Sequence, residues 1–150
     1  RDWSYEKSAD EVSRVLADGT ALDKFRQWIT AQGGDASFVD DPSILGTAAV
    51  QHRYVSQTAG YIYHMDAELI GKAASALGAG RLKSGDEIDH LAGIVFLKKT
   101  GDAIAPDETV AFLHTSDKKR LADAEAYLND AINVTPVRPA PETLIYTVID

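Results

Sequence analysis

One short segment of the chain, Gly78-Ala79-Gly80-Arg81, combines glycines with an arginine, a combination from which phosphate sites can be built. Glycine lets backbone N–H groups approach an anion, and a guanidinium pairs with phosphate through two parallel hydrogen bonds. Anions are held at helix N-termini, however, whereas this segment follows an apolar helical stripe that ends at Leu77. We therefore expect Gly78 and Gly80 to close a helix rather than to bind phosphate.

The polar segment that follows, Gly85-Asp86-Glu87-Ile88-Asp89, offers partners for Arg81. We expect the planar guanidinium of Arg81 either to bond the last carbonyls of the helix or to pair with one of these three carboxylates and pin the crossing loop. Three carboxylates this close together in the sequence could also provide oxygen ligands for a hard cation. Because no twelve-residue calcium loop surrounds them, the segment is interpreted as a turn. Gly101 and Asp102 belong to a second turn, which joins two strands.

The four histidines, His52, His64, His90 and His114, are too far apart in the sequence to share one helix face as a zinc-binding pair does. His52 and His64 lie on neighbouring predicted strands and could meet across a sheet, and His90 could be oriented by Asp89. Exposed or hydrogen-bonded strand histidines are the simpler interpretation. The chain also has no cysteine and no Gly-x-Ser-x-Gly motif. We assign no catalytic, cofactor-binding or metal-binding residue to this chain.

Composition narrows the possible partners. The 150 residues are 45% hydrophobic, enough for a buried core, and their 23 acidic and 15 basic side chains give a net charge of -8. This charge argues against nucleic acid and anionic membranes as partners, and the apolar runs are shorter than the ~20 residues of a membrane helix. The lack of cysteine and of a signal peptide suits the cytoplasm. Because the chain opens on Arg1 rather than Met, we expect a piece excised from a longer protein.

Two helices are expected at the start of the chain. An apolar stripe between Ser8 and Gly19 predicts the first, with Ser8 as its cap, and a second stripe between Thr20 and Gly33 predicts the next. Two such helices cannot form a core alone. Their joint apolar face should therefore cover something else, either the rest of this chain or a missing neighbour.

The residues from Asp35 to Gly46 show little periodicity and are interpreted as a connector. They close a first segment, 1–46, and the main domain is expected at 47–150. The expected fold class is α+β, in which two N-terminal helices precede a domain with a mixed or antiparallel sheet and two helices.

Periodicity also predicts the elements of the main domain. They are strands at 48–56, 60–64, 94–97 and 109–113, helices from 66 to 77 and from about 116 to 132, and a terminal strand at 143–149. The first two strands flank a turn at Gln57-Thr58-Ala59, and the next two form a hairpin with an irregular loop. Pro136 and the prolines after it prevent the last helix from continuing.

The stretch from Gly60 to His114 resembles the C-terminal domain of the pyrimidine-nucleoside phosphorylase and thymidine phosphorylase family. The residues that carry this resemblance are Leu77-Gly78-Ala79-Gly80-Arg81, Gly85-Asp86-Glu87-Ile88-Asp89 and Lys98-Lys99-Thr100-Gly101-Asp102. Earlier segments in the same order resemble the helices that lead into this domain: Gly19-Thr20-Ala21-Leu22-Asp23-Lys24-Phe25, Ala31-Gln32-Gly33-Gly34-Asp35 and Asp41-Pro42. Separated matches in the right order are more specific than one glycine motif.

The resemblance implies that the residues from about Ala48 form an α/β hammerhead domain, and that the first two helices end the large α/β domain that holds phosphate. It implies a parent pentosyltransferase of pyrimidine metabolism and nucleoside salvage, in which inorganic phosphate, as co-substrate, attacks the sugar C1′ of a pyrimidine nucleoside and releases the base. Family residues for phosphate and pyrimidine lie upstream of the matched region. We therefore expect an inactive structural piece whose partner is the rest of the phosphorylase, with a homodimeric parent.

An independent carrier or binding module is the alternative. The segment around Gly101-Asp102 also resembles the hairpin of biotinyl and lipoyl carrier domains, and Thr115-Ser116-Asp117-Lys118 resembles the hairpin whose lysine those domains modify. A carrier lysine sits on a tight turn between two strands, whereas Lys118 enters a helical pattern that includes Leu121. The hypothesis of a structural domain is therefore favoured over a stand-alone barrel-sandwich-like module.

Overall fold

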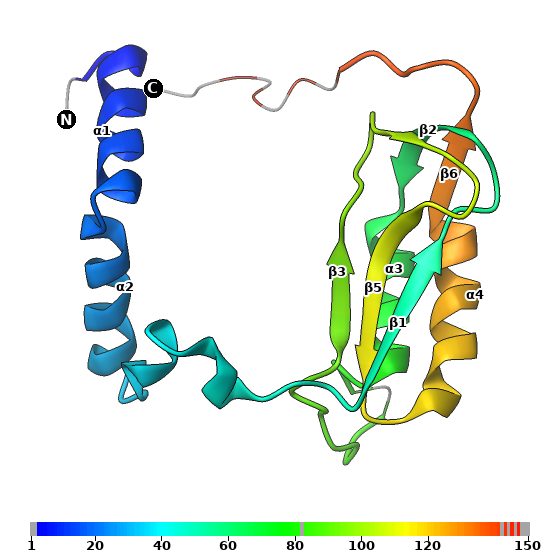
Figure 1. The fold of residues 1–150 in the computed structure, drawn as a ribbon, viewed down its shortest axis with the longest axis horizontal. Helices are drawn as coiled ribbons and strands as arrows, with labels where there is room; N and C mark the ends of the chain where they lie inside the picture. The colour runs from blue at the N-terminus through cyan, green and yellow to red at the C-terminus, as the bar shows by residue number, and fades with distance from the viewer. Residues whose placement is uncertain (1–2, 82, 142, 144, 146, 148–150) are drawn as a thin grey trace. The chain divides into compact units, whose positions relative to one another are not determined.

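The computed structural model describes residues 3–81, 83–141, 143, 145 and 147. The chain divides into two compact units, Arg1–Thr47 and Ala48–Asp150, which we call the helical unit and the sheet unit. Two helices precede two small antiparallel sheets, so the predicted α+β class is confirmed (Figure 1). Among the described residues, no helix combines the length and the apolar character needed to cross a bilayer.

The helical unit begins with α1 (Tyr5–Ala17), whose start differs from the prediction. The cap is Ser4 and not Ser8, because the Ser4 hydroxyl oxygen accepts a hydrogen bond from the backbone N–H of Lys7 at 3.3 Å. Ser8 lies one turn inside the helix, and its hydroxyl donates to the carbonyl of Ser4 at 3.0 Å. The first turn is polar, so apolar periodicity could not mark it.

The second helix, α2 (Thr20–Ala31), ends just before Gly33, which has a φ of +80°. The expected connector contains two short 3-10 helices, η1 (Ala36–Val39) and η2 (Pro42–Leu45). The Phe38 ring of η1 lies edge-on to Phe25 of α2, with 6.1 Å between the ring centroids. Local contacts of this kind hold the helical unit, and none of its described residues is buried.

The sheet unit contains two three-stranded sheets in place of the single sheet that was expected. One has the order β1 (Val50–Val55), β5 (Thr109–Thr115), β3 (Gly93–Phe96), and the other has the order β4 (Ala103–Ile104), β2 (Gly60–Met65), β6 (Ile132–Thr135). All pairs are antiparallel. The predicted hairpin of β3 and β5 is present, but its connection supplies β4 to the other sheet.

Neighbours in sequence are not neighbours in the sheets for β1 and β2. The turn at 57–59 carries the chain from one sheet to the other, so these strands do not pair with each other. Ser56 keeps the end of β1 beside β5, because its N–H donates to the carbonyl of Glu108 at 2.9 Å and its carbonyl accepts from Asp107 at 2.8 Å. Alternation identified the strands, but pairing depends on long-range contacts that alternation does not encode.

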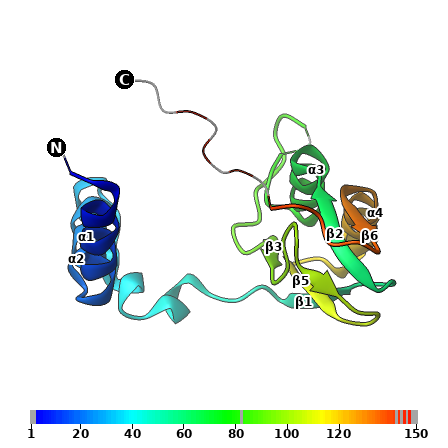
Figure 2. The same cartoon turned by 90° about the horizontal axis from the view of Figure 1, so that it is seen from above.

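Two helices cover one face of the β1–β5–β3 sheet (Figure 2). They are α3 (Ala67–Leu77) and α4 (Leu121–Ala131). The predicted cap of α3 is confirmed, because the Asp66 carboxylate accepts from the Leu69 N–H at 3.0 Å. The last helix ends one residue earlier than predicted, because Ile132 pairs with Met65 as the first residue of β6. The apolar side chain of Ile132 is compatible both with the apolar stripe of the helix and with a strand.

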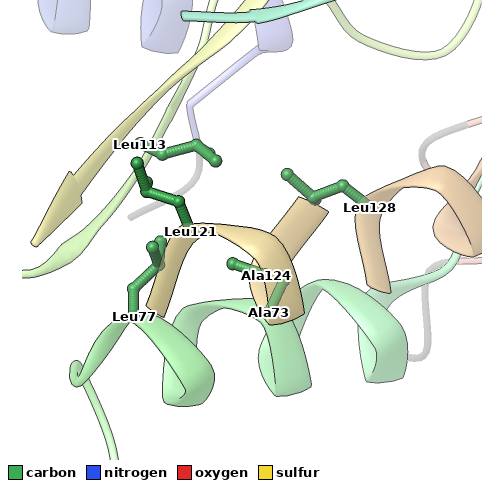
Figure 3. Packing of buried hydrophobic residues seen from close by; sticks show 6 residues of the cluster. All are labelled: Ala73, Leu77, Leu113, Leu121, Ala124 and Leu128. Carbon is green, nitrogen blue, oxygen red and sulfur yellow. The ribbon is translucent and has the colours of Figure 1, made fainter. Parts of the chain in front are cut away.

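The main core lies between α3, α4 and β5 (Figure 3). Its buried members are Ala73, Leu77, Leu113, Leu121, Ala124 and Leu128. Ala73 and Ala124 are fully buried where the two helices meet, and such small side chains let helix backbones approach closely. A smaller cluster of Ile62, Ile104 and Val110 packs between the second sheet and β5. The terminal strand expected at 143–149 lies largely outside the described residues and stays a prediction.

Candidate functional site

A Cβ atom on either of the two glycines after α3 would come into close contact with a neighbouring side chain. Gly78 has a φ of +111°, and a Cβ atom there would collide with the guanidinium of Arg120 and lie 3.1 Å from the Cβ of Asp89. A Cβ on Gly80 would lie 2.7 Å from the hydroxyl oxygen of Ser75. Gly78 closes the helix, as the sequence predicts, and its left-handed conformation favours glycine.

Donors from distant parts of the sheet unit bond the carbonyl end of α3. The buried hydroxyl of Thr115 donates to the Leu77 carbonyl at 2.8 Å, and Nη1 of Arg120 donates to the same oxygen at 3.4 Å. The backbone N–H of Asp89 donates to the Gly78 carbonyl at 2.9 Å. This end of the helix is therefore joined to β5, to α4 and to the crossing loop, the residues from 79 to 92.

Asp89 connects the crossing loop to the end of β5. Its two carboxylate oxygens accept from the backbone N–H groups of Leu91 at 3.0 Å and Ser116 at 2.8 Å. Hydrogen bonding from Ser116 is the largest cause that lowers the pKa of Asp89, and the Leu91 N–H and the positive charge of Arg120 add to it. The ionised carboxylate is thus the form that the folded loop favours.

For Arg81 the sequence left two roles open, bonding the last carbonyls of α3 or pairing with a carboxylate of the crossing loop, and both stay predictions. Arg81 is exposed and lines a cavity of about 560 Å³ together with other loop residues, namely Gly85, Asp86, Glu87, Ile88 and His90. The Asp86 carboxylate accepts from the Lys83 N–H at 2.9 Å. Sequence reasoning missed Arg120 and Thr115, which bond Leu77 from about forty residues away, and no local pattern marks such partners.

A larger cavity of about 690 Å³ lies between α3, α4 and the crossing loop. Its lining is Ser75, Ala76, Gly80, Asp86, Glu87, Arg120, Asp123, Ala126 and Tyr127. Three carboxylates and one guanidinium give it a mixed, mainly negative character, which does not favour a phosphate dianion. Within the described part of the chain, no group of three or more acidic or histidine side chains is arranged to hold a metal ion.

The second glycine segment joins the two sheets. Gly101, with a φ of +92°, donates its N–H to the Ile62 carbonyl at 2.8 Å, and the Ile62 N–H donates to the Asp102 carbonyl at 3.0 Å. The Asp102 carboxylate accepts from the Lys99 N–H at 2.9 Å and so closes the turn. The segment is a turn, as the sequence predicts, and it binds the backbone of β2.

A lysine and a glutamate brace the connection around β4. Nζ of Lys98 lies 2.5 Å from Oε1 of Glu108 and donates to the Ala103 carbonyl at 3.1 Å. The other carboxylate oxygen of Glu108 accepts from the Ala105 N–H at 2.8 Å. The hydrogen bond from Lys98 is the largest cause that lowers the pKa of Glu108. This pair was not predicted from the sequence, although opposite charges that flank a hairpin connection are a usable signal.

The histidine pair considered from the sequence does not form a cluster. His52 on β1 and His64 on β2 belong to different sheets, so the alternative in which they meet across one sheet is not realised. Nε2 of His52 instead lies 2.5 Å from Oε1 of Glu125 on α4. One turn further along α4, the Tyr54 hydroxyl donates to Asn129 at 2.9 Å, and burial raises the pKa of this tyrosine. These pairs attach α4 to β1.

The modification site of the carrier alternative has an unsuitable setting in the structure. Lys118 is the first residue of the 3-10 helix η3 (Lys118–Arg120), which leads directly into α4. It does not sit on a tight turn between paired strands, where a prosthetic arm would swing freely.

Together, these contacts define an α+β domain whose glycine-rich turns and charged loop hold its own backbone. The family model of the pyrimidine nucleoside phosphorylase C-terminal domain matches residues 61–135. This range runs from β2 to the end of β6, which pair with each other, and it contains both glycine segments. The chain belongs to the family of pyrimidine nucleoside phosphorylase C-terminal domains.

Similar proteins cover almost the whole chain. It is 39% identical over 145 residues to the pyrimidine-nucleoside phosphorylase of Geobacillus stearothermophilus, covering 95% of this chain and 33% of that protein. The enzymes of Bacillus subtilis and Staphylococcus haemolyticus are 37% and 36% identical over 144 residues, with 96% of this chain and 33% of each relative covered. The chain therefore spans about one third of the length of these relatives.

Proposed function

We propose that this chain supplies the C-terminal part of a pyrimidine-nucleoside phosphorylase. In the proposed reaction, inorganic phosphate attacks C1′ of a pyrimidine nucleoside, the bond from C1′ to the base breaks, and the base and a pentose 1-phosphate are released. The observation that carries the proposal is the family match over 61–135, which spans the paired strands β2 and β6. The role proposed for this chain is support of the enzyme's shape, with the reacting groups located elsewhere in the enzyme.

The hydrogen bonds of the candidate residues favour a structural role for this chain. Phosphorolysis needs groups that bind a phosphate dianion and stabilise the charge that leaves with the base. Asp89 and Asp102 instead hold backbone N–H groups of this chain, and Thr115 and Arg120 hold the carbonyl end of α3. A helix carbonyl end carries a partial negative charge and repels phosphate.

The same contacts suggest what the domain contributes mechanically. The bonds at the end of α3 join both helices and β5, and the bonds around Gly101 join the two sheets. A domain braced in this way keeps its shape when forces act on its surface. In an enzyme whose lobes close around two substrates, a rigid appendage can set the shape of the lobe that carries it.

The remaining expectations about the parent enzyme belong to this proposal. They are a homodimeric enzyme in the cytoplasm, no cofactor besides phosphate as co-substrate, and the rest of the phosphorylase as the main partner of this chain. Nucleic acid and membranes are not proposed as partners, since the net charge of -8 repels phosphate groups.

The test is an activity comparison between this chain and a chimera. The chimera carries this chain in place of the matched third of the Bacillus subtilis relative. Uracil release from uridine and phosphate should be absent for the chain alone and present for the chimera. The unaltered relative is the positive control. Turnover by the chain alone that persists through repurification would contradict the supporting role, and a folded but inactive chimera would contradict the assignment to the reaction.

A further inference from the structure

A cavity of about 310 Å³ lies where the chain passes from one sheet of the sheet unit to the other. Its lining comes from the end of β1 and the turn at 57–58, from β4 and β5, and from α4 and β6. β1 and β5 belong to one sheet, whereas β4 and β6 belong to the other. The cavity therefore opens between the two sheets, and we call it the inter-sheet cavity.

The inner wall of the inter-sheet cavity is apolar. Ile104 on β4 and Val110 on β5 line it and are only 5% and 1% exposed. Ile132 of β6 also lines the cavity and packs against the cluster that these two side chains form. In β1 the pairing register shifts between Tyr54 and Val55, and such a bulge bends a strand and redirects its side chains. The result is an apolar wall of short branched side chains that the face of a flat ring can contact.

Polar groups complete the lining of the inter-sheet cavity. Asn129 on α4 is exposed, and its Oδ1 accepts a hydrogen bond from the Tyr54 hydroxyl at 2.9 Å. A carboxamide has two acceptor positions on its oxygen and two donors on its nitrogen. The Ser56 hydroxyl, by contrast, is engaged by the backbone of Thr58, since it donates to the carbonyl at 2.7 Å and accepts from the N–H at 3.3 Å. The bond to Tyr54 therefore orients Asn129 and leaves it a donor and an acceptor side by side.

Charge and size restrict what the inter-sheet cavity can hold. Among the described residues that line it, none carries a charge at neutral pH. A phosphate, carboxylate or ammonium group is costly to bury against such a lining, because no opposite charge pairs with it. The volume is near the lower end of the range of roughly 300–1,000 Å³ for ligand cavities, which suits a single ring. An asparagine carboxamide pairs with a ring edge that presents a donor and an acceptor next to each other, as it does with adenine in DNA.

We infer that the inter-sheet cavity binds a small neutral heterocycle with an amide edge. The face of the ring lies on Ile104 and Val110, and its adjacent N–H and C=O groups bond the carboxamide of Asn129. Free pyrimidine bases belong to this class of ligand. The choice of a pyrimidine base rests on the proposed function, in which the enzyme releases that base. This chain then holds a product of the reaction in addition to supporting the shape of the enzyme.

A titration of this chain with uracil tests the inference. Nuclear magnetic resonance should show saturable shifts of the backbone amides of 54–58 and 129–134 and of the side-chain amide of Asn129. The dissociation constant should be about 0.1–5 mM, since a ligand of one ring makes few contacts. The analogue 1,3-dimethyluracil keeps the ring and both carbonyls but has no N–H group, so it should bind about tenfold more weakly or worse. No saturable shift with uracil, or equal binding of the two compounds, would overturn the inference.

Substitutions in this chain locate the site. Asn129→Leu keeps a side chain of similar size without the carboxamide and should weaken uracil binding about tenfold or more. Asn133→Leu is the matched control, because Asn133 is also exposed but lies on β6 outside the cavity lining, and it should leave the dissociation constant unchanged. Val134→Phe should abolish binding with the carboxamide intact, since its ring fills the cavity, and it serves as the second variant if thermal melts show that Asn129→Leu does not fold. Unchanged uracil binding in Asn129→Leu or in Val134→Phe would contradict the site.

Failure of this inference and failure of the proposed function give different results. If the chimera releases uracil from uridine but this chain shows no saturable shift with uracil, the proposed function stands and the inference is wrong. If this chain binds uracil at the inter-sheet cavity but the folded chimera lacks phosphorolysis, the binding site stands and the proposed function fails.

Discussion

The helical unit and the sheet unit both contain amphipathic helices, but only the sheet unit buries their apolar stripes. Leu16 on α1 is 68% exposed, whereas Leu128 on α4 is fully buried, although both occupy apolar stripes of amphipathic helices. The difference lies in the partner surface. α4 packs against α3 and β5 within the same unit, and the described contacts of α1 and α2 supply no buried position.

This contrast shows that amphipathicity reports the need for a partner without identifying it. A helix stripe becomes core only where another apolar surface meets it, and most helical stability in proteins comes from that packing. Within this one chain, the sheet unit buries its helix stripes against its own strands and helices, whereas no described residue of the helical unit is buried.

The largest predicted effect compares the same substitution in both units. Leu128→Ala should lower the free energy of unfolding of the chain by ~2–5 kcal/mol, because it removes buried methyl groups and leaves a cavity in the main core. Leu16→Ala should change it by about 0.5 kcal/mol or less in the chain alone. Urea denaturation followed by circular dichroism measures both. Equal losses would show that Leu16 is buried in the isolated chain.

A smaller effect compares two glycines of the sheet unit. Gly78→Ala should destabilise the chain by at least ~1–2 kcal/mol, because its left-handed backbone disfavours a Cβ and Arg120 occupies the space. Gly71 lies inside α3 with nothing within 4 Å of a Cβ atom, so Gly71→Ala should stabilise by ~0.5–1 kcal/mol. Thermal melts of both variants provide the measurement. A shift of the same sign in both would contradict the closing role of Gly78.

The smallest effect is a pH dependence that belongs to the sheet unit. The pKa of Asp89 is lowered in the fold, so its stabilising contribution is present above its unfolded pKa and is lost as pH falls through the folded pKa. Stability should therefore decline on acidification below about pH 4. Asp89→Asn should flatten this decline and lower stability at pH 7. Urea midpoints from pH 7 to pH 3 test this, and a decline of unchanged steepness in Asp89→Asn would contradict it.

Element bounds followed closely from local residues. Asp66 and Gly78 delimit α3 through a side-chain cap and a left-handed glycine, both of which act within one helical turn. Gly33 marks the end of α2 in the same manner. Errors arose where one pattern suited two structures: the first turn of α1 is too polar to show periodicity, and Ile132 suits a helix stripe as well as β6.

For the candidate site, the turns could be predicted from the sequence, whereas their long-range partners could not. Glycine and aspartate predicted turns after α3 and around Gly101, because their backbone preferences are local. The partners that bond those turns, Thr115, Arg120 and the carbonyl of Ile62, could not be predicted, because nothing in the sequence near a turn records which distant donor reaches it.

The sequence by itself determined the α+β class, most helix ends, the glycine turns and the family, since each of these is written in residues close together along the chain. Only the tertiary structure decided that β1 and β2 enter different sheets and that Arg120 and Thr115 bond the end of α3. Strand pairing and long-range hydrogen bonds depend on which surfaces meet when the whole chain packs, and that choice is made by burial and by the satisfaction of buried polar groups.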